Sequence, residues 1–268
     1  MIEKSLEFLR AQKIEADLAI VLGSGLGPLA DKISSSKRIP YSQIPGAKTS
    51  GVAGHKGELV AGDLQGQRIV ALSGRLHGYE GHTPNEVVYI LRVLRKLGVR
   101  KFILSNASGS THKAFAPGSL ALIRDHINFT GLNPLTGKDL YGGERFPDMS
   151  DVYSRKWREQ VLGLSKSLKS KFPLKEAVYI GVRGPSFETP SEIKAFCTMG
   201  ADIVGMSTVW EAIALKQLGA EILGISCVGN FGAGVTHQVL KHEDVLQAGR
   251  DASQEFQNLV EAIVRTSV

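Results

Sequence analysis

The chain has 268 residues, of which 43% are hydrophobic and 22% charged, with a net charge of +6 at pH 7. This composition is typical of a globular protein and excludes a disordered or collagen-like chain. The two cysteines, Cys197 and Cys227, form no C-x-x-C pair, so neither a zinc ribbon nor a disulfide framework is indicated. The charged N-terminal residues resemble neither a secretory signal nor a membrane span. We therefore expect a cytoplasmic protein with one domain over residues 1–268.

The excess of positive charge favours an anionic partner, which can be nucleic acid, a membrane or a small phosphate. The basic residues are scattered, as in residues 92–101 and 166–175, in the manner of solvated helix faces. No zinc finger, basic zipper or aromatic RNA-stacking motif accompanies them. We expect neither nucleic acid nor membrane as a partner, and a basic nucleic-acid-binding protein stays open only as the non-enzyme alternative.

Apolar runs alternate with helical patterns along the chain. The expected strands are residues 17–22, 58–61, 67–72, 101–105, 120–129, 176–182, 202–204 and 221–228, and the expected helices are residues 5–12, 84–97, 156–170, 191–199, 211–218 and 243–264. This order predicts a single-domain α/β fold with a mixed, twisted central sheet surrounded by helices. Residues 133–150 are expected to form a long loop, a length that indicates a function or an interface.

A glycine-rich turn, Gly23-Ser24-Gly25-Leu26-Gly27, follows the first strand directly. Backbone N–H groups in such a turn can surround an anion. The turn matches neither a dinucleotide fingerprint nor a P-loop, so on its own it is explained equally well as a plain strand-to-helix connection.

A second polar segment follows the strand that ends at Leu72. Arg75 and His77 are two residues apart, so in an extended segment their side chains point the same way. A guanidinium matches phosphate with two hydrogen bonds, and an imidazolium adds a second charged donor. A metal site at His77 and His82 is the competing interpretation, but their spacing fits no standard ligand pattern.

Glycine-rich or polar turns also follow the strands expected to end at Ser105 and Val228. Ligands of α/β sheets bind beyond the carboxyl ends of strands, so these turns predict one shared crevice. A further loop carries Phe187 and Glu188. Its flanking residues Pro185 and Pro190 exclude a helix there and predict a rigid loop.

Seven motifs together carry a family resemblance. They are Gly23-Ser24-Gly25-Leu26-Gly27, Gly54-His55, Gly74-Arg75-x-His77-x-Tyr79-Glu80-Gly81, Asn106-Ala107-x-Gly109, Gly184-Pro185-Ser186-Phe187-Glu188-Thr189, Gly205-Met206-Ser207-Thr208-Val209, and Asn230. In this order and spacing the chain closely resembles the trimeric purine nucleoside phosphorylases of the 6-oxopurine-specific kind, over residues from about 20 to 255.

The resemblance implies phosphorolysis of purine ribonucleosides or deoxyribonucleosides, such as inosine and guanosine, by a homotrimer. Inorganic phosphate is then a co-substrate, and neither a metal nor an organic cofactor is implied. The implied phosphate set is Ser24, Arg75, His77, Ser207 and the backbone of Ala107, with His55 at its mouth; the ribose set is Tyr79, Met206 and His242; the purine set is Phe187, Glu188 and Asn230. His77, Glu188 and Asn230 are the implied catalytic residues.

The chemistry of the purine set fits these roles. The departing purine accumulates negative charge, which an amide N–H of Asn230 can stabilise at the N7 edge. The carboxylate of Glu188 can accept the N1–H that a 6-oxopurine has and adenine lacks. Phe187 offers an aromatic face to the flat base.

The closest alternative within the same fold is a 5′-methylthioadenosine phosphorylase. Asn230 argues against it, because specificity for a 6-aminopurine typically brings an aspartate there, and His242 suits a free 5′-hydroxyl. Four positions depart from the family pattern. Ser110 stands where a second glycine is common, and Phe231 follows Asn230 where many vertebrate members have lysine. Trp210 stands where many members have proline, and Gly142 aligns with an aromatic that many members lend to a neighbouring subunit, with Tyr141 and Phe146 as the nearby aromatic residues.

Overall fold

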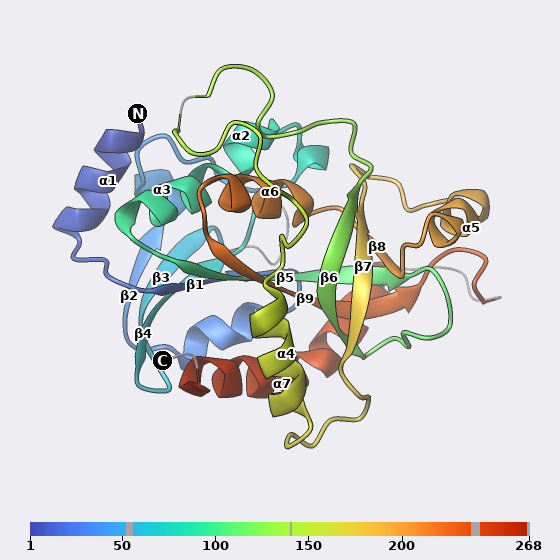
Figure 1. Ribbon diagram of the computed structural model, residues 1–268. Helices are drawn as coiled ribbons and strands as arrows, with labels where there is room; N and C mark the ends of the chain where they lie inside the picture. The colour runs from blue at the N-terminus through green and yellow to red at the C-terminus, as the bar shows by residue number, and fades with distance from the viewer. Residues whose placement is uncertain (52–55, 140, 237–241, 267–268) are drawn as a thin grey trace.

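The computed structural model describes residues 1–51, 56–139, 141–236 and 242–266, the side chains of residues 242–251 excepted (Figure 1). Within these residues nine strands form one sheet in the order β2-β3-β4-β1-β5-β8-β7-β6-β9. The strands are β1 (Leu18–Leu22), β2 (Ser34–Pro40), β3 (Glu58–Leu64), β4 (Gln67–Ser73), β5 (Lys101–Ser110), β6 (Leu120–Asn128), β7 (Lys175–Gly181), β8 (Ile203–Gly205) and β9 (Glu221–Phe231).

The sheet closes on itself through β5. One edge of β5 pairs first with β1, up to Leu104, and then with β8 at Gly109 and Ser110. Its other edge pairs with β9, which continues through β6 and β7 back to β8. Parallel and antiparallel pairs both occur, so the predicted α/β fold with a mixed, curved sheet is confirmed. The edge of β5 changes partner between Leu104 and Gly109, and β1 ends there.

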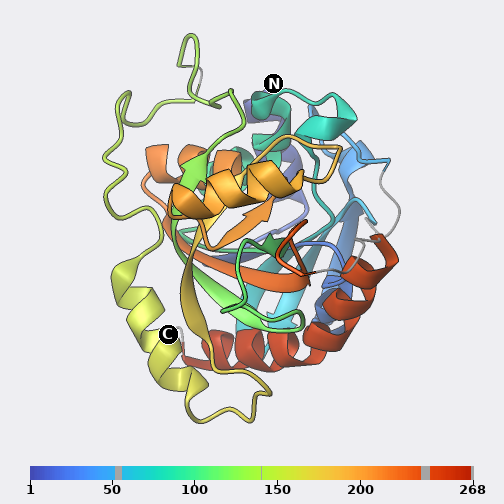
Figure 2. The same cartoon turned by 90° about the vertical axis from the view of Figure 1, so that its right-hand side faces the viewer.

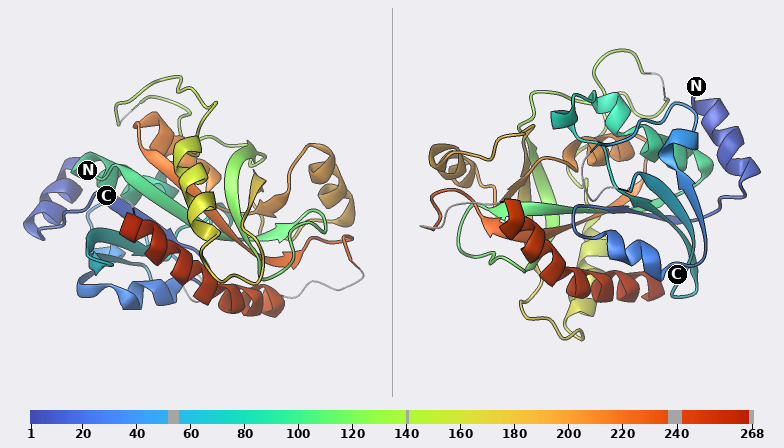
Figure 3. Two further views of the ribbon diagram at one scale, coloured as in Figure 1. Left: turned by 60° about the horizontal axis from the view of Figure 1, so that its bottom comes forward. Right: turned by 180° about the vertical axis from the view of Figure 1, so that it is seen from behind.

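Helices cover both faces of the sheet. They are α1 (Ile2–Ala11), α2 (Pro84–Val87), α3 (Tyr89–Leu97), α4 (Arg155–Ser165), α5 (Pro190–Thr198), α6 (Val209–Gln217) and α7 (His242–Thr266), with 3-10 turns η1 (Gly27–Lys32), η2 (Tyr41–Gln43) and η3 (Gly78–Glu80). In Figure 1, α1, α3 and α6 lie above the sheet and α4 and α7 below it. Figure 3 shows α7 running along the lower face beside η1.

The side chains of β1 explain this layering. Ala19 and Val21 belong to the apolar cluster under α1, α3 and α6, whereas Ile20 and Leu22 belong to the cluster under α4, α7 and η1. Successive side chains of a strand point to opposite faces, so an unbroken apolar run is what a strand buried on both faces requires.

Three of the expected strand ends are wrong. β3 continues from Ala61 to Leu64. β5 continues from Ser105 to Ser110, and β9 continues from Val228 to Phe231. Small residues continue the extended chain there because β5 is paired on both edges, with a register shift after Ser108. The predicted turns at Asn106 and Asn230 are therefore strand ends inside the closed part of the sheet. The strand ends at Leu22 and near Leu72 agree with the structure.

Other boundaries also differ from the expectation. The strand β2 was not predicted, because six of its seven side chains are exposed and its pairing with β3 alone makes it a strand. The helix expected over residues 84–97 is interrupted at Val88, and the one expected to reach Ser170 ends at Ser165. No helix among the described residues is long and apolar enough to cross a membrane.

The long loop between β6 and α4 is anchored to the body at Arg92. The buried Arg92 guanidinium donates to Asn85 Oδ1 at 2.6 Å and to the carbonyl of Pro134 at 3.0 Å. It also lies 4.0 Å from the ring centroid of Tyr141. Phe146, farther along, is 84% exposed. Figure 2 shows this loop running along the outside of the molecule toward α4.

Candidate active site

Ten of the twelve predicted site residues line one cavity of about 460 Å³, a size usual for small-molecule sites. They are Ser24, Arg75, His77, Tyr79, Ala107, Phe187, Glu188, Met206, Ser207 and Asn230. His55 lies outside the described residues. His242 is the first residue of α7, and its side chain also lies outside the description. Residues from six separate segments of the chain thus meet at one place.

Gly23 lets the first turn reach this cavity. A Cβ on Gly23 would lie 2.8 Å from Asn106 Cα and 2.9 Å from the carbonyl oxygen of Ser105, both backbone atoms of β5. A side chain at this position would push β1 away from β5. The glycine therefore allows Ser24 to line the cavity together with Ala107 of β5.

Arg75 is buried and held at both ends of its guanidinium. Nε donates to Glu211 Oε1 at 3.0 Å and Nη2 donates to Glu211 Oε2 at 2.7 Å. Nη1 donates to the carbonyl of Ser105 at 2.5 Å and lies 3.4 Å from Ser207 Oγ. Arg75 and Ser207, predicted to bind the same anion, are therefore in contact.

His77 is oriented by the turn that follows it. Glu80 Oε1 accepts from the His77 backbone N–H at 2.9 Å and lies 3.2 Å from His77 Nδ1. The imidazole stacks on Tyr79, with 4.6 Å between ring centroids and 16° between planes. Burial raises the pKa of Tyr79 to about 12, so its hydroxyl stays neutral. The Glu80 carboxylate fixes the ring orientation and favours a hydrogen on Nδ1.

Glu80 also holds the segment that leads to His55. Its Oε2 accepts from Ser50 Oγ at 2.8 Å and from the backbone N–H of Gly51 at 3.1 Å. Burial opposes ionisation of this carboxyl, but the hydrogen bonds from Ser50, Gly51 and His77 hold the pKa of Glu80 below its usual value. An ionised Glu80 therefore connects Ser50 and Gly51 to His77.

The turn at Ser207 is strained and firmly held. Thr208 has φ +68°, a conformation that β-branched residues rarely adopt. Its buried Oγ1 accepts from Asn106 Nδ2 at 2.8 Å, and the N–H of Ser207 donates to the hydroxyl of Tyr179 at 3.3 Å. Strained backbone of this kind persists where surrounding contacts fix it, and it is concentrated at functional sites.

The residues predicted to bind the base line the same cavity. Phe187 is 42% exposed and Glu188 is half-buried, on the loop that ends where Thr189 caps α5. Burial is the main reason why the pKa of Glu188 is raised, with repulsion from Glu192 adding to it and its own backbone N–H opposing it. Asn230 Nδ2 donates to the carbonyl of Phe231 at 2.9 Å, which uses one of its two hydrogens.

Comparison with known proteins identifies the family. The phosphorylase superfamily model matches residues 17–265. Purine nucleoside phosphorylase 1 of Geobacillus stearothermophilus is 42% identical over 266 residues, covering 98% of this chain and 96% of that protein. The chain belongs to the purine nucleoside phosphorylases of the phosphorylase superfamily.

Solved structures of this family have the same fold. A crystal structure of a Schistosoma purine nucleoside phosphorylase in complex with hypoxanthine has a TM-score of 0.93 and 32% identity, covering 99% of this chain and 96% of that one. Isoform 2 from Schistosoma mansoni, in complex with cytosine and ribose-1-phosphate, has a TM-score of 0.92 and 34% identity, covering 99% and 95%.

Trp210, one of the departures from the family pattern, packs beside the site. A Cβ on Gly78 would lie 2.7 Å from its indole ring, so the ring occupies the space directly against the turn between His77 and Tyr79. Its Nε1 donates to Thr130 Oγ1 at 2.9 Å. The larger residue at this position thus supports the turn that carries His77.

The sequence analysis gave no site role to part of the cavity wall or to the partner of Arg75, although Gly109, Pro185 and Gly205 of that wall stand in its motifs. The further lining residues are Ser108, Gly109, Pro185, Val204 and Gly205. Glu211 was placed only in a helix. A signal for it is nevertheless present, since Glu211 is the one charged residue in the run from Val209 to Leu215, and that run is buried throughout.

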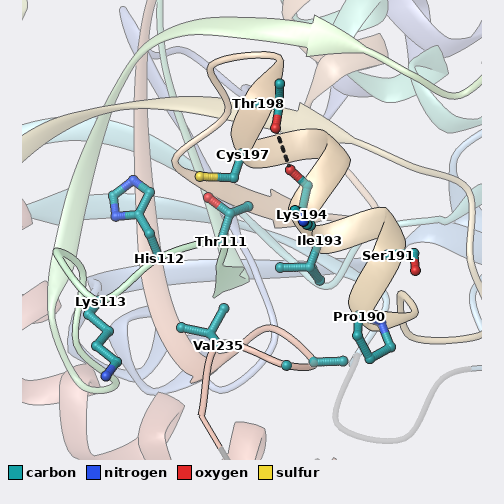
Figure 4. A pocket seen from close by; sticks show the side chains of 12 residues that line it. Thr111, His112, Lys113, Pro190, Ser191, Ile193, Lys194, Cys197, Thr198 and Val235 are labelled. Atoms are coloured by element: carbon teal, nitrogen blue, oxygen red, sulfur yellow. Dashed lines mark hydrogen bonds between the residues drawn. The ribbon is translucent and has the colours of Figure 1, made fainter.

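A second cavity of about 650 Å³ lies beside α5. Figure 4 shows His112 and Lys113 on one side of it and Cys197 and Thr198 of α5 on the other. None of the predicted site residues lines it. In the part of the chain that the structure describes, no three histidine, cysteine, aspartate or glutamate residues are grouped so that they could hold a metal ion.

Proposed function

We infer that the protein catalyses the phosphorolysis of purine nucleosides and deoxynucleosides such as inosine and guanosine. An oxygen of inorganic phosphate forms a bond to C1′ of the sugar, the bond from C1′ to the purine nitrogen breaks, and the electron pair leaves with the base. The products are the free purine and ribose or deoxyribose 1-phosphate. The observation that carries this proposal is that Arg75 and Ser207, which are in contact, line the same cavity as Glu188 and Asn230, in a chain of this family.

The proposed roles follow from the chemistry of each side. Ser24, Arg75, His77, Ser207 and the backbone of Ala107 would hold the phosphate, which is a co-substrate rather than a cofactor. Tyr79 and Met206 would contact the ribose, together with His242. Phe187, Glu188 and Asn230 would bind the base. His55 is proposed at the mouth of the phosphate subsite. A cytoplasmic location stays a prediction.

The charges that develop in the transition state can be stabilised by both the phosphate-binding and the base-binding residues. The sugar acquires oxocarbenium character while the purine gains negative charge, so donors at the base edge lower the barrier. Asn230 supplies such a donor at N7. The phosphate side acts by positioning and electrostatics, since an anion held by Arg75 and Ser207 next to C1′ stabilises the developing positive charge.

One assay tests the function directly. Incubating the protein with inosine should release hypoxanthine only when inorganic phosphate is present, and ribose 1-phosphate should form in equal amount. The same assay with 5′-methylthioadenosine tests the alternative within the fold. Hypoxanthine release that is independent of phosphate, or activity on 5′-methylthioadenosine alone, would contradict the proposal.

The raised pKa of Glu188 predicts an acid limb in the pH profile. Only the carboxylate form accepts the N1–H of the base. Because burial raises this pKa, Glu188 loses its charge at a higher pH than an ordinary glutamate, and kcat/KM for inosine should begin to fall there as pH decreases. The measurement is the pH dependence of kcat/KM in the wild type and in Glu188→Gln. Identical acid limbs in both proteins would show that Glu188 does not cause the loss.

We propose a homotrimer, as the family resemblance implies. The long loop between β6 and α4 supports a trimer. The ring of Tyr141 packs against the Arg92 guanidinium, whereas Phe146, near the end of the loop, is 84% exposed. An exposed aromatic on a long loop is typical of an interface residue. Light scattering at micromolar concentration should give three times the chain mass of 28.9 kDa. A monomer would contradict the proposal, and Phe146→Ser should weaken the trimer.

A further inference from the structure

Glu211 is a buried acid whose two oxygens are given to one arginine. It is 2% exposed and lies in the first turn of α6, where the helix dipole favours a negative charge. Oε1 and Oε2 accept from Nε and Nη2 of Arg75 at 3.0 and 2.7 Å. This two-bond arrangement fixes the plane of the guanidinium as well as its position.

The two bonds to Glu211 determine where the opposite edge of the Arg75 guanidinium, the Nη1 edge, points. With Nε and Nη2 held by Glu211, the remaining nitrogen Nη1 is directed to the carbonyl of Ser105 and to Ser207 Oγ, 3.4 Å away. Arg75 and Ser207 both line the candidate active site. We propose that Glu211 is a positioning residue for phosphorolysis, which holds Arg75 so that its Nη1 edge meets the phosphate beside Ser207. This proposal rests on the function proposed above.

One short segment then places both phosphate ligands. Ser207 precedes the strained residue Thr208, and Glu211 follows it by three positions. Asn106 holds Thr208 from β5, so the start of α6 is fixed to the closed part of the sheet. Through Glu211 this turn also fixes Arg75, which comes from the loop after β4. The distance between the two ligands is thereby set by a single rigid turn.

The negative charge of Glu211 has an effect on phosphate binding that opposes its positioning role. The Glu211 carboxylate reduces the attraction of Arg75 for an anion, so its removal would tighten phosphate binding if charge alone mattered. Because Arg75 is buried, we do not expect tighter phosphate binding after removal of Glu211. Arg75 is 5% exposed, so loss of the Glu211 carboxylate removes a charged acceptor from a buried guanidinium, which then turns toward other acceptors or toward water. Loss of orientation should therefore dominate.

Two variants separate orientation from charge. Glu211→Gln keeps the size but removes the charge and sets an amide N–H₂ against the guanidinium. Glu211→Asp keeps the charge but draws it back by one methylene. Both should raise the KM for phosphate, by about 10-fold in the glutamine variant, the scale of a charge-assisted hydrogen bond. The KM for inosine at saturating phosphate should change less than about twofold.

The matched control is Glu176→Gln. Glu176 of β7 pairs with Arg158 of α4, and neither residue lines the candidate active site. Its removal costs an arginine–glutamate ion pair that is more exposed than the Arg75–Glu211 pair, but it should leave the KM for phosphate unchanged. A merely structural role for Glu211 would lower the folded fraction and thermal stability of its variants without moving this KM.

Binding of inorganic phosphate gives a readout independent of turnover. The increase in Tm with phosphate concentration reports the affinity for phosphate. Both Glu211 variants should need a higher phosphate concentration than the wild type to reach the same increase in Tm. If the glutamine variant does not fold, the aspartate variant decides. An unchanged or lower phosphate requirement would overturn the role of Glu211. A wild type that binds phosphate but releases no hypoxanthine would instead contradict the proposed function.

Discussion

Replacing Arg75 by alanine is expected to weaken phosphate use by about 2 kcal/mol or more, roughly 30-fold in kcat/KM for phosphate. The guanidinium is a charged donor in a buried part of the cavity wall, where its contact with phosphate is not weakened by solvent. Lysine should restore only part of the loss, because an ammonium cannot reproduce the planar arrangement that Glu211 and Ser105 hold.

The structure adds a second effect to this variant. Without Arg75 the carboxylate of Glu211 would be a buried charge that has lost its arginine partner, at a cost of about 3–5 kcal/mol in the free energy of unfolding. The double variant Arg75→Ala/Glu211→Gln removes that charge and should recover much of the stability. Phosphate use should stay impaired in the double variant, since neither change restores the donor.

Phosphate saturation curves and urea unfolding of the two variants and of Arg75→Lys separate these effects. Unchanged phosphate saturation in Arg75→Ala would refute the assignment of Arg75 to phosphate. A double variant whose phosphate use returns together with its stability would attribute the defect to folding rather than to the lost contact.

The sequence predicts those parts of the site that depend on local chemistry. The apolar run before Gly23 identifies a strand buried on both faces, and the glycine marks the place where β1 ends against the backbone of β5. The prolines around Glu188 likewise predict a non-helical loop, and in the structure it ends at the capped start of α5. Local patterns of this kind are sufficient because the cause lies within a few residues.

What the sequence does not predict depends on contacts between distant segments. The strand β5 continues past Ser105 because β8 and β9 pair with its last residues. Both of these strands come much later in the sequence than β5. The strand β2 exists because β3 offers it a hydrogen-bonding edge. The partner of Arg75 is 136 positions away on α6. No local propensity encodes these pairings, so only the fold reveals them.

Asn230→Asp is expected to change the choice of base. We propose that Asn230 selects 6-oxopurines by donating an amide N–H to the O6/N7 edge. An ionised aspartate has only acceptors, so it repels the lone pairs of O6 and accepts from a 6-amino group. A site built to hydrogen-bond one group rejects its mismatch strongly, so kcat/KM for inosine should fall by about 10²-fold or more. Measurable activity on adenosine should appear.

Two features of the site limit the gain on adenosine. Asn230 Nδ2 donates to the carbonyl of Phe231, and an aspartate would lose this bond and face that carbonyl with a second acceptor. Glu188 lines the same cavity, and its carboxylate would oppose the N1 lone pair of adenine. Adding Glu188→Gln to Asn230→Asp should therefore raise adenosine activity further, because the amide can donate to N1.

The control is Asn230→Ala, which removes the donor without adding an acceptor. It should lower activity on inosine and gain none on adenosine, since nothing in it favours a 6-amino group. The measurement is kcat/KM for inosine and adenosine at saturating phosphate in the wild type and in each variant. If the two values fall together in Asn230→Asp and their ratio stays that of the wild type, Asn230 does not read the base, and the proposed preference for 6-oxopurines loses its main support.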